Sequence, residues 1–193
     1  MPTTAESRQR ANRGPAAGPG NRRALIAAAR EVYAADGLSA PFSAVAKRAG
    51  VGQGSLYRHF PDRIALAVAV FEENVADLEA QTSGEDRTID DLLDRVVDQA
   101  MVSTAFIDLI TQHLRDPRVA SLGIRFRSLV ARLVAREHAA GHLGAHVDVE
   151  DVTMAAGMLA TELARTDADQ RPAAAARARA LFRAAFAPRP AAT

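Results

Sequence analysis

A short segment of the chain gathers side chains whose chemistry suits nucleic acid. Residues 53–59 read Gln-Gly-Ser-Leu-Tyr-Arg-His, and amide, guanidinium, hydroxyl and imidazole groups bond to base edges and phosphate oxygens. Arg58 can take both acceptors of a guanine and Gln53 can pair with an adenine, each contributing roughly 1–3 kcal/mol of discrimination. The same side chains would also suit a solvated helix face, so the elements that position them decide between the two interpretations.

The residues on either side of this segment predict a helix-turn-helix. The apolar face of a first short helix includes Ala46, which is small enough for a second helix to cross closely. Gly50 falls where the two helical patterns meet, and a left-handed backbone at that position costs glycine little. Val51 and Leu56 then close the small core. This register leaves the polar side chains of residues 53–59 on or beside the outward face of the second helix, which favours DNA contact.

Longer helices are predicted before and after this motif. Apolar residues recur at three- and four-residue steps from Asn21, which can cap the first helix, to Gly37, which can end it. A fourth helix is expected from Arg63 to about Gln81, with Asp62 as its cap. Four helices are therefore expected before residue 82.

The charge of the chain is unevenly distributed. Residues 1–63 carry ten Lys or Arg against four Asp or Glu, whereas residues 64–193 carry fourteen against nineteen. Binding to a polyanion requires a concentrated positive field, so a nucleic-acid partner is expected for the first part only. Arg8, Arg10 and Arg13 lie in a Pro- and Gly-rich stretch predicted to be disordered, either as a minor-groove arm or as a solvated leader.

Composition excludes several other classes of protein. The chain has no cysteine, which excludes disulfides and thiolate metal sites, and its first residues lack the apolar run of a secretory signal. No stretch of about eighteen apolar residues is present, so no membrane partner is expected and a cytoplasmic location is predicted. The sequence has neither a Gly-Xaa-Ser-Xaa-Gly elbow nor a Gly-rich phosphate loop after a strand, so we expect no enzyme activity and no cofactor.

The rest of the chain predicts further helices and no strands. Apolar stripes at helical spacing run from residue 89 nearly to residue 187, with Asp116 and Asp148 as predicted caps and Pro117 suited to a first turn. We therefore expect an all-α protein of about nine helices. Its expected segments are a disordered basic tail over 1–20, a three-helix helix-turn-helix DNA-binding domain over 21–66, a helical effector-binding and dimerisation domain over 67–187, and a loose tail over 188–193.

The pattern of residues 21–70 resembles the TetR family of bacterial repressors. The resemblance rests on a leading helix, a capped fourth helix and these residues between them: Ala46, Gly50, Val51, Gly54, Ser55, Leu56, Tyr57, His59 and Phe60. It implies a homodimer that binds a palindromic operator in double-stranded DNA and is released from it by a small molecule. Gly52 departs from the family pattern, in which a serine often caps the second helix of the motif, and glycine loses roughly a few tenths of a kcal/mol there.

The resemblance also implies roles for individual residues. Tyr57 and His59 would contact phosphates, and Arg63 would hold a phosphate where lysine is commoner in the family. Other side chains of the motif would face the major groove. The expected DNA-binding residues are Lys47, Gln53, Gly54, Ser55, Tyr57, Arg58, His59 and Arg63.

Small and apolar residues of the last two predicted helices indicate a dimer surface. Such residues allow close helix contact, so the two helices can form half of a four-helix bundle that a second copy completes. The same pattern also fits a core within one chain. The residues expected at the interface are Met154, Gly157, Met158, Leu181, Phe182 and Ala185.

The helices between about residues 88 and 163 are expected to enclose a small-molecule effector. Apolar residues at helical spacing fill a core more often than they line a pocket, so both interpretations stay open for each of them. Methionine and aromatic side chains adapt to varied shapes and favour an apolar or aromatic ligand. The candidate ligand-binding residues are Met101, Thr104, Phe106, Ile110, His113, Leu122, Phe126, Leu129, Met158 and Thr161.

Other interpretations of the chain remain open. His138, His142 and His146 recur at four-residue steps, but Gly141 and Gly144 interrupt the helix that would align them, so no metal site is expected. A DNA-binding regulator without a small-molecule effector, either constitutive or gated by a protein, would have a filled second core. A helical enzyme or metal carrier with a vestigial DNA-binding domain is the more distant alternative.

Overall fold

The structure of the protein is a computed structural model that describes residues 18–37, 40–84, 86–102, 107 and 112–189. The described residues form eight α-helices and no strand, so the expected all-α fold is confirmed. Within the apolar stripes expected from residue 89 to nearly 187, residues 103–106 and 108–111 lie outside the described residues. The helices are α1 (Gly18–Asp36), α2 (Phe42–Arg48), α3 (Gln53–His59), α4 (Arg63–Gln81), α5 (Ile89–Val102), α7 (Pro117–Ala139), α8 (Val149–Arg165) and α9 (Arg171–Phe186).

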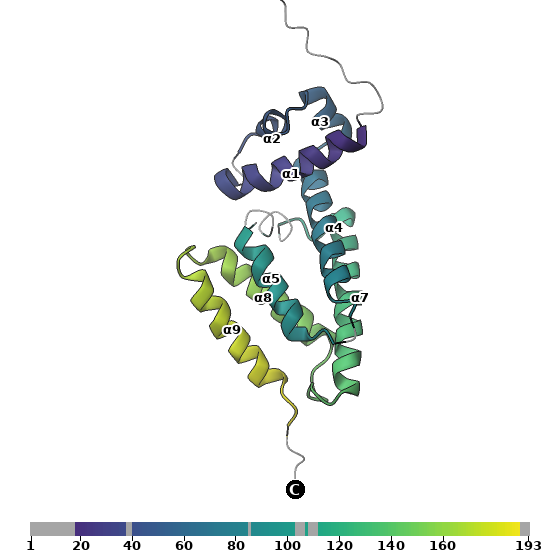
Figure 1. Ribbon diagram of the computed structural model, residues 1–193, viewed down its shortest axis with the longest axis vertical. Helices are drawn as coiled ribbons and strands as arrows, with labels where there is room; N and C mark the ends of the chain where they lie inside the picture. Colours follow the sequence, from purple (N-terminus) through teal and green to yellow (C-terminus); the bar gives the residue numbers. More distant parts are fainter. Residues whose placement is uncertain (1–17, 38–39, 85, 103–106, 108–111, 190–193) are drawn as a thin grey trace, which may run out of the picture.

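The helices form two groups that α4 connects. Figure 1 shows α1, α2 and α3 at one end of the molecule, and α5, α7, α8 and α9 towards the other. Helix α4 starts in the first group and continues beside α7 into the second, and it contacts α1, α5 and α7. Helix α9 lies at the outer edge of the second group, packed against α5 and α8.

The first apolar core joins α1, α2, α3 and the first half of α4. Leu25, Val45, Leu56 and Leu66 are completely buried in it. The short helix α3 contributes a single fully buried side chain, Leu56, and its other side chains are exposed or half-buried. Because α4 continues without a break, the core extends to Val70, which is beyond the domain boundary expected at residue 66.

A second and larger core joins α5, α7, α8 and α9. Leu92, Leu133, Leu159 and Leu163 are buried there, each from a position on its helix that repeats at helical spacing. A third, small cluster of Val68, Val119 and Leu122 joins α4 to the start of α7. The two groups of helices are therefore linked by apolar packing along α4 as well as by the chain itself.

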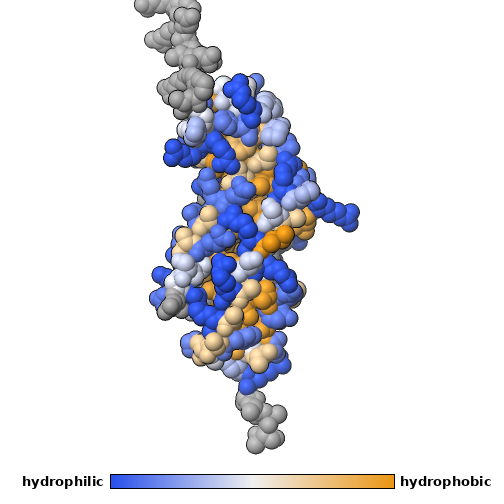
Figure 2. Space-filling view, turned by 90° about the vertical axis from the view of Figure 1, so that its right-hand side faces the viewer, coloured by the Kyte–Doolittle hydropathy of each residue, from blue (hydrophilic) through white to orange (hydrophobic). Residues whose placement is uncertain are grey.

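The surface on the side of α4 and α7 is mixed in character. Figure 2 looks at the molecule from this side, and hydrophilic residues make up most of the visible face, with apolar residues in small groups between them. One exposed apolar side chain of α7 is Ile124, which is 67% exposed. Single exposed apolar residues of this kind are ordinary on protein surfaces.

Helix ends follow the predicted caps except at the start of α1. Asp62 accepts a hydrogen bond from the Ala65 amide at 2.7 Å, and the expected ends of α4 at Arg63 and Gln81 are confirmed. Asp116 and Asp148 cap α7 and α8 as predicted, the latter in a reciprocal capping box. The described part of α1 is helical from its first residue, Gly18, so Asn21 lies inside the helix and is not its cap.

Candidate functional site

The turn between α2 and α3 has the geometry of a helix-turn-helix. Gly50 has a φ of +66°, a left-handed conformation in which a residue with a Cβ would be strained. The Val51 amide donates to the Ala46 carbonyl at 3.0 Å, and Gly52 caps α3 as expected. Ala46 is buried under this turn. The predicted helix-turn-helix is confirmed, with α3 in the position of the helix that reads DNA, and we call it the reader helix.

The reader helix presents nearly all its polar side chains to solvent. Gln53, Tyr57 and Arg58 are exposed, as is the Gly54 backbone, and the remaining members Ser55 and His59 are half-buried. Tyr57 is 53% exposed. The structure therefore brings the predicted DNA-contacting residues of α3 together on one accessible surface.

A ring contact holds the exposed tyrosine in place. The Tyr57 ring packs edge-on against the ring of Phe42 in α2, with centroids 5.5 Å apart and planes at 78°. Phe42 itself is buried in the first core. The contact therefore restricts the Tyr57 ring while half of its side chain stays open to a ligand.

The cations around the reader helix differ in their ion pairing. Arg48 of α2 forms an ion pair with Glu31 of α1. Its neighbour Lys47 and the reader-helix residue Arg58 are exposed and have no acidic partner among the described residues. Arg63 is half-buried at the start of α4. Lys47 and Arg58 thus have a positive charge that is open to an external anion.

One cation beside the reader helix was not selected from the sequence. The Arg22 guanidinium of α1 lies 5.5 Å from the ring centroid of Phe60, the residue that ends α3. It also lies 3.9 Å from a carboxylate oxygen of Glu72 in α4. No spacing in the sequence relates residue 22 to residue 60, so the contact between these two side chains could be identified only from the folded structure. The other candidate cations, Arg8, Arg10 and Arg13, lie outside the described residues.

The expected effector-binding residues lie in different environments. Leu122 and Leu129 are buried in two separate cores, and Phe126 packs against the second core while partly exposed. His113 and Thr161 are half-buried. Met158 is 58% exposed on α8, away from any core. The remaining candidates, whose side chains the structure does not describe, are Met101, Thr104, Phe106 and Ile110.

The expected dimer residues lie on the outer faces of α8 and α9. Met154, Met158 and Leu181 are among the most exposed large apolar side chains of the described chain, at 60%, 58% and 65%. Gly157 and Ala185 are exposed as well. Phe182 is half-buried, and its ring stacks on that of Phe186 at 6.0 Å. Met154, Met158, Phe182 and Ala185 line a groove of about 360 Å³ between the two helices.

Two histidines, one in the last turn of α7 and one between α7 and α8, lie within hydrogen-bond distance of backbone carbonyls. His138 Nε2 lies 3.2 Å from the Gly144 oxygen, and His146 Nε2 lies 2.9 Å from the Ala185 oxygen. Among the described residues, no group of three or more His, Cys, Asp or Glu side chains is arranged to hold a metal ion. None of the described helices combines the length and the apolar character needed to cross a bilayer.

Comparison with known proteins agrees with this arrangement. The family model described as bacterial regulatory proteins, tetR family, matches residues 25–70, from α1 to the first half of α4. A TetR transcriptional regulator from Streptomyces coelicolor is 27% identical, with 88% of this chain and 99% of that chain covered and a TM-score of 0.63. Curated protein sequences gave no match.

Other solved structures share the fold at lower identity. GusR from Salmonella enterica is 23% identical over 92% of this chain and 99% of that chain, with a TM-score of 0.61. A γ-butyrolactone receptor described as ArpA-like is 20% identical over 89% of this chain and 90% of that chain, with a TM-score of 0.58. The similarity covers both groups of helices, whereas the family model covers the first.

Proposed function

We propose that this chain, whose residues 25–70 match the family model of bacterial regulatory proteins of the tetR family, is a homodimeric transcriptional repressor that binds a palindromic operator and is released by a small molecule. The observation that carries the proposal is the exposed surface of the reader helix. There Tyr57, held by Phe42, lies on the same short helix as Arg58, whose charge has no acidic partner in the described part of the chain.

The chemistry of this surface suits a duplex. Arg58 and Gln53 have the side-chain types that bond to guanine and adenine in the major groove, and Tyr57, His59 and Lys47 are suited to phosphate oxygens. A small DNA-binding module gains too little from one helix to select an operator. Two reader helices related by a two-fold axis would contact successive half-sites of a palindrome.

The outer face of α8 and α9 supports dimerisation. Exposed methionines at positions 154 and 158 border the groove between these helices, and the exposed Gly157 lies between them on α8. An equivalent pair of helices from a second copy can cover this face and form a four-helix bundle. The face belongs to the second group of helices, so a dimer formed there leaves both reader helices open.

Salt-dependent DNA binding tests the proposal with a matched set of variants. Lys47→Gln should weaken binding to every duplex and reduce the salt slope by about 0.9 for each phosphate that the variant no longer neutralises. Arg58→Gln should cost roughly 1–3 kcal/mol on the operator and much less on unrelated DNA. The control is Arg48→Gln, which removes the same charge from a neighbour that Glu31 already engages. Equal effects of Lys47→Gln and Arg48→Gln would contradict the assignment.

A regulator without a small-molecule effector is the second candidate. Leu122 and Leu129, two of the candidate effector-binding residues, are buried in apolar cores, which is the filled core that such a regulator would have. Operator binding can be measured with the low-molecular-mass fraction and with the protein fraction of cells that carry the gene. Release by the first fraction supports the effector-controlled repressor, and release by the second fraction alone supports a protein-gated regulator.

A further inference from the structure

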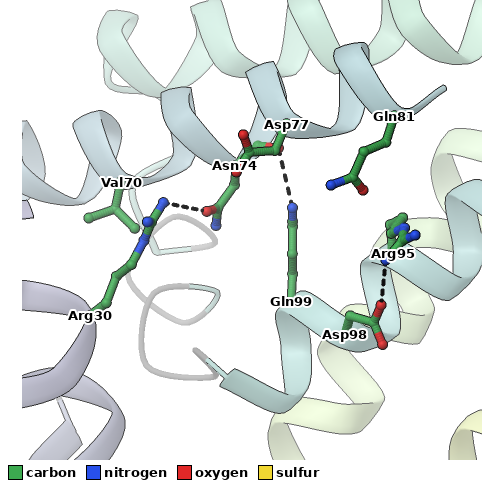
Figure 3. Close-up of a pocket in the computed structure, with 8 residues that line it drawn as sticks. All are labelled: Arg30, Val70, Asn74, Asp77, Gln81, Arg95, Asp98 and Gln99. Carbon is green, nitrogen blue, oxygen red and sulfur yellow. Dashed lines mark hydrogen bonds and ion pairs between the residues drawn. The ribbon is translucent and has the colours of Figure 1, made fainter. Parts of the chain in front are cut away.

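A polar cleft of about 280 Å³ lies where α1, α4 and α5 meet. Figure 3 shows its side chains converging from the three helices, with α4 along one wall. Seven of its eight lining side chains are polar or charged. They are Arg30 of α1, Val70, Asn74, Asp77 and Gln81 of α4, and Arg95, Asp98 and Gln99 of α5. Such a lining excludes the apolar ligand that the sequence favoured, as far as this cleft is concerned.

Both cations of the cleft are already neutralised. Arg30 Nη2 donates to Asn74 Oδ1 at 2.9 Å and lies 3.3 Å from a carboxylate oxygen of Glu73. Arg95 Nη1 lies 3.2 Å from an oxygen of Asp98. Figure 3 shows both contacts within the cleft, apart from Glu73, which it does not draw. Neither guanidinium is therefore a ready site for an anionic ligand.

Some polar groups of the cleft have no partner within the described ranges, and most of them lie on α4. Asp77 and Gln81 are one turn apart on one helix face, and both are exposed. Neither has a hydrogen-bond or ion-pair partner among the described residues. Gln99 Nε2 donates to the Asn74 carbonyl at 3.3 Å, which leaves its amide oxygen for another donor. The uncommitted groups of the cleft thus include one carboxylate, the whole side-chain amide of Gln81 and the amide oxygen of Gln99.

We propose that this cleft binds a small hydrophilic organic amine, whose protonated nitrogen pairs with Asp77 and whose other hydrogen-bonding groups meet Gln81 and Gln99. A protonated amine carries a positive charge and hydrogen-bond donors, and the cleft offers it the uncommitted Asp77 carboxylate and the amide oxygens of Gln81 and Gln99, while both cations are already engaged. That the amine acts as effector rests on the proposed function above. The binding of the amine to the cleft does not depend on that function.

The position of the cleft connects such a ligand to the DNA-binding helices. One wall is α1, which packs in the first core together with the reader helix, and the opposite wall is α5 of the second group. Asn74 of α4 is hydrogen-bonded from both walls: Arg30 of α1 donates to its side chain and Gln99 of α5 donates to its backbone carbonyl. A ligand held between these residues therefore favours one spacing of α1 and α5, and it shifts operator binding if the DNA-bound state has another spacing.

Three probes of matched length and different charge test the proposal on the full-length protein. They are putrescine, which is cationic, 1,4-butanediol, which is neutral, and succinate, which is anionic. The readout is NMR titration of the side-chain amide signals of Asn74, Gln81 and Gln99, assigned by single substitutions. Putrescine should bind more tightly than butanediol, and succinate should bind least.

Asp77→Asn should weaken putrescine binding about two- to fivefold, the range expected for an exposed charge pair. Glu72→Gln is the matched control, because it removes one negative charge from α4 outside the cleft. It should leave putrescine binding unchanged. Succinate binding as tightly as putrescine, or equal effects of the two substitutions, would overturn the proposal. Operator binding is measured on the same samples. If the protein binds its operator but putrescine does not bind the cleft, the amine proposal fails and the proposed function does not.

Discussion

The guanidinium of Arg118 binds the carboxylate of Asp62 across the interface between α7 and α4. Its Nη1 atom lies 3.2 and 3.1 Å from the two oxygens of Asp62. On its other side, Arg118 Nε and Nη2 lie 3.0 and 2.7 Å from the oxygens of Asp116. Asp62 caps α4 and Asp116 caps α7, so one side chain joins the starts of two helices. Because α4 follows the reader helix closely in the chain, this contact helps to set the position of the reader helix against α7.

Arg118→Gln should therefore weaken operator binding about two- to thirtyfold, the usual range for a residue that couples two elements. The salt dependence of binding should stay the same, because the number of neutralised phosphates does not change. Arg125→Gln is the matched control: it breaks the 2.7 Å pair between Arg125 and Glu79, which joins the same two helices further from the reader helix. The urea unfolding midpoint of each variant is measured as well, so that operator binding is compared only between folded samples. Equal losses of DNA affinity in both variants would disprove a special role for Arg118.

The same contacts predict a specific loss of stability in acid. Hydrogen bonds from Arg118 lower the pKa of Asp116 from the ordinary value of 3.8 to about 2. The folded state therefore holds the charged carboxylate more strongly than the unfolded state does, and this stabilisation is complete above the ordinary pKa. It should disappear as the pH falls from about 4 through about 2. Urea unfolding midpoints across this range should fall less steeply for Asp116→Asn, since asparagine still caps a helix but does not titrate.

Two glycines near the reader helix should respond oppositely to alanine. Gly50 has a φ of +66°, and a Cβ there meets no atom within 4 Å, so only backbone strain opposes the substitution. Gly50→Ala should destabilise the protein by about 1–2 kcal/mol. Gly54 lies within α3 with the same open space, so Gly54→Ala should stabilise it by up to about 1 kcal/mol. Thermal or urea unfolding measures both, and a stabilising Gly50→Ala would show that the turn is not strained.

A charge placed on α8 should separate the proposed dimer. Met158→Arg puts an unpaired cation into an apolar interface, which should cost about 2–5 kcal/mol of association free energy. Ile124→Arg is the control, because Ile124 is similarly exposed but lies on α7. Sedimentation equilibrium of the two variants gives the comparison. If Ile124→Arg dissociated the dimer and Met158→Arg did not, the interface would lie on α7.

The helix-turn-helix could be predicted from local features alone. Gly50 requires a left-handed bend, Leu56 supplies the one buried anchor of α3, and Asp62 caps the next helix, and each signal lies within a few residues of the structure that it specifies. Short-range signals of this kind need no knowledge of the fold. The expectation that Asn21 caps α1 was wrong: asparagine is a good cap by type, but Asn21 lies within the helix.

Contacts between distant residues could not be predicted in the same way. Asp62 and Asp116 were each expected as caps, but nothing in the sequence shows that Arg118 binds both. The polar cleft was missed for the same reason, since Arg30, Asp77 and Gln99 come from three helices whose faces meet only in the folded chain. Helical spacing identified buried leucines correctly but did not distinguish a filled core from a cavity wall, as Leu129 shows.

The unbroken course of α4 has a practical consequence for protein engineering. Ala67, Ala69 and Val70 of α4 are part of the first apolar core, and α4 then continues beside α7. A chimera spliced at residue 66 would lack these side chains, so the apolar surface of the first three helices that they cover would be exposed and prone to aggregate. A chimera that joins the second group of helices to another DNA-binding domain should therefore be spliced at the turn after Gln81, so that the whole of α4 stays with the first group.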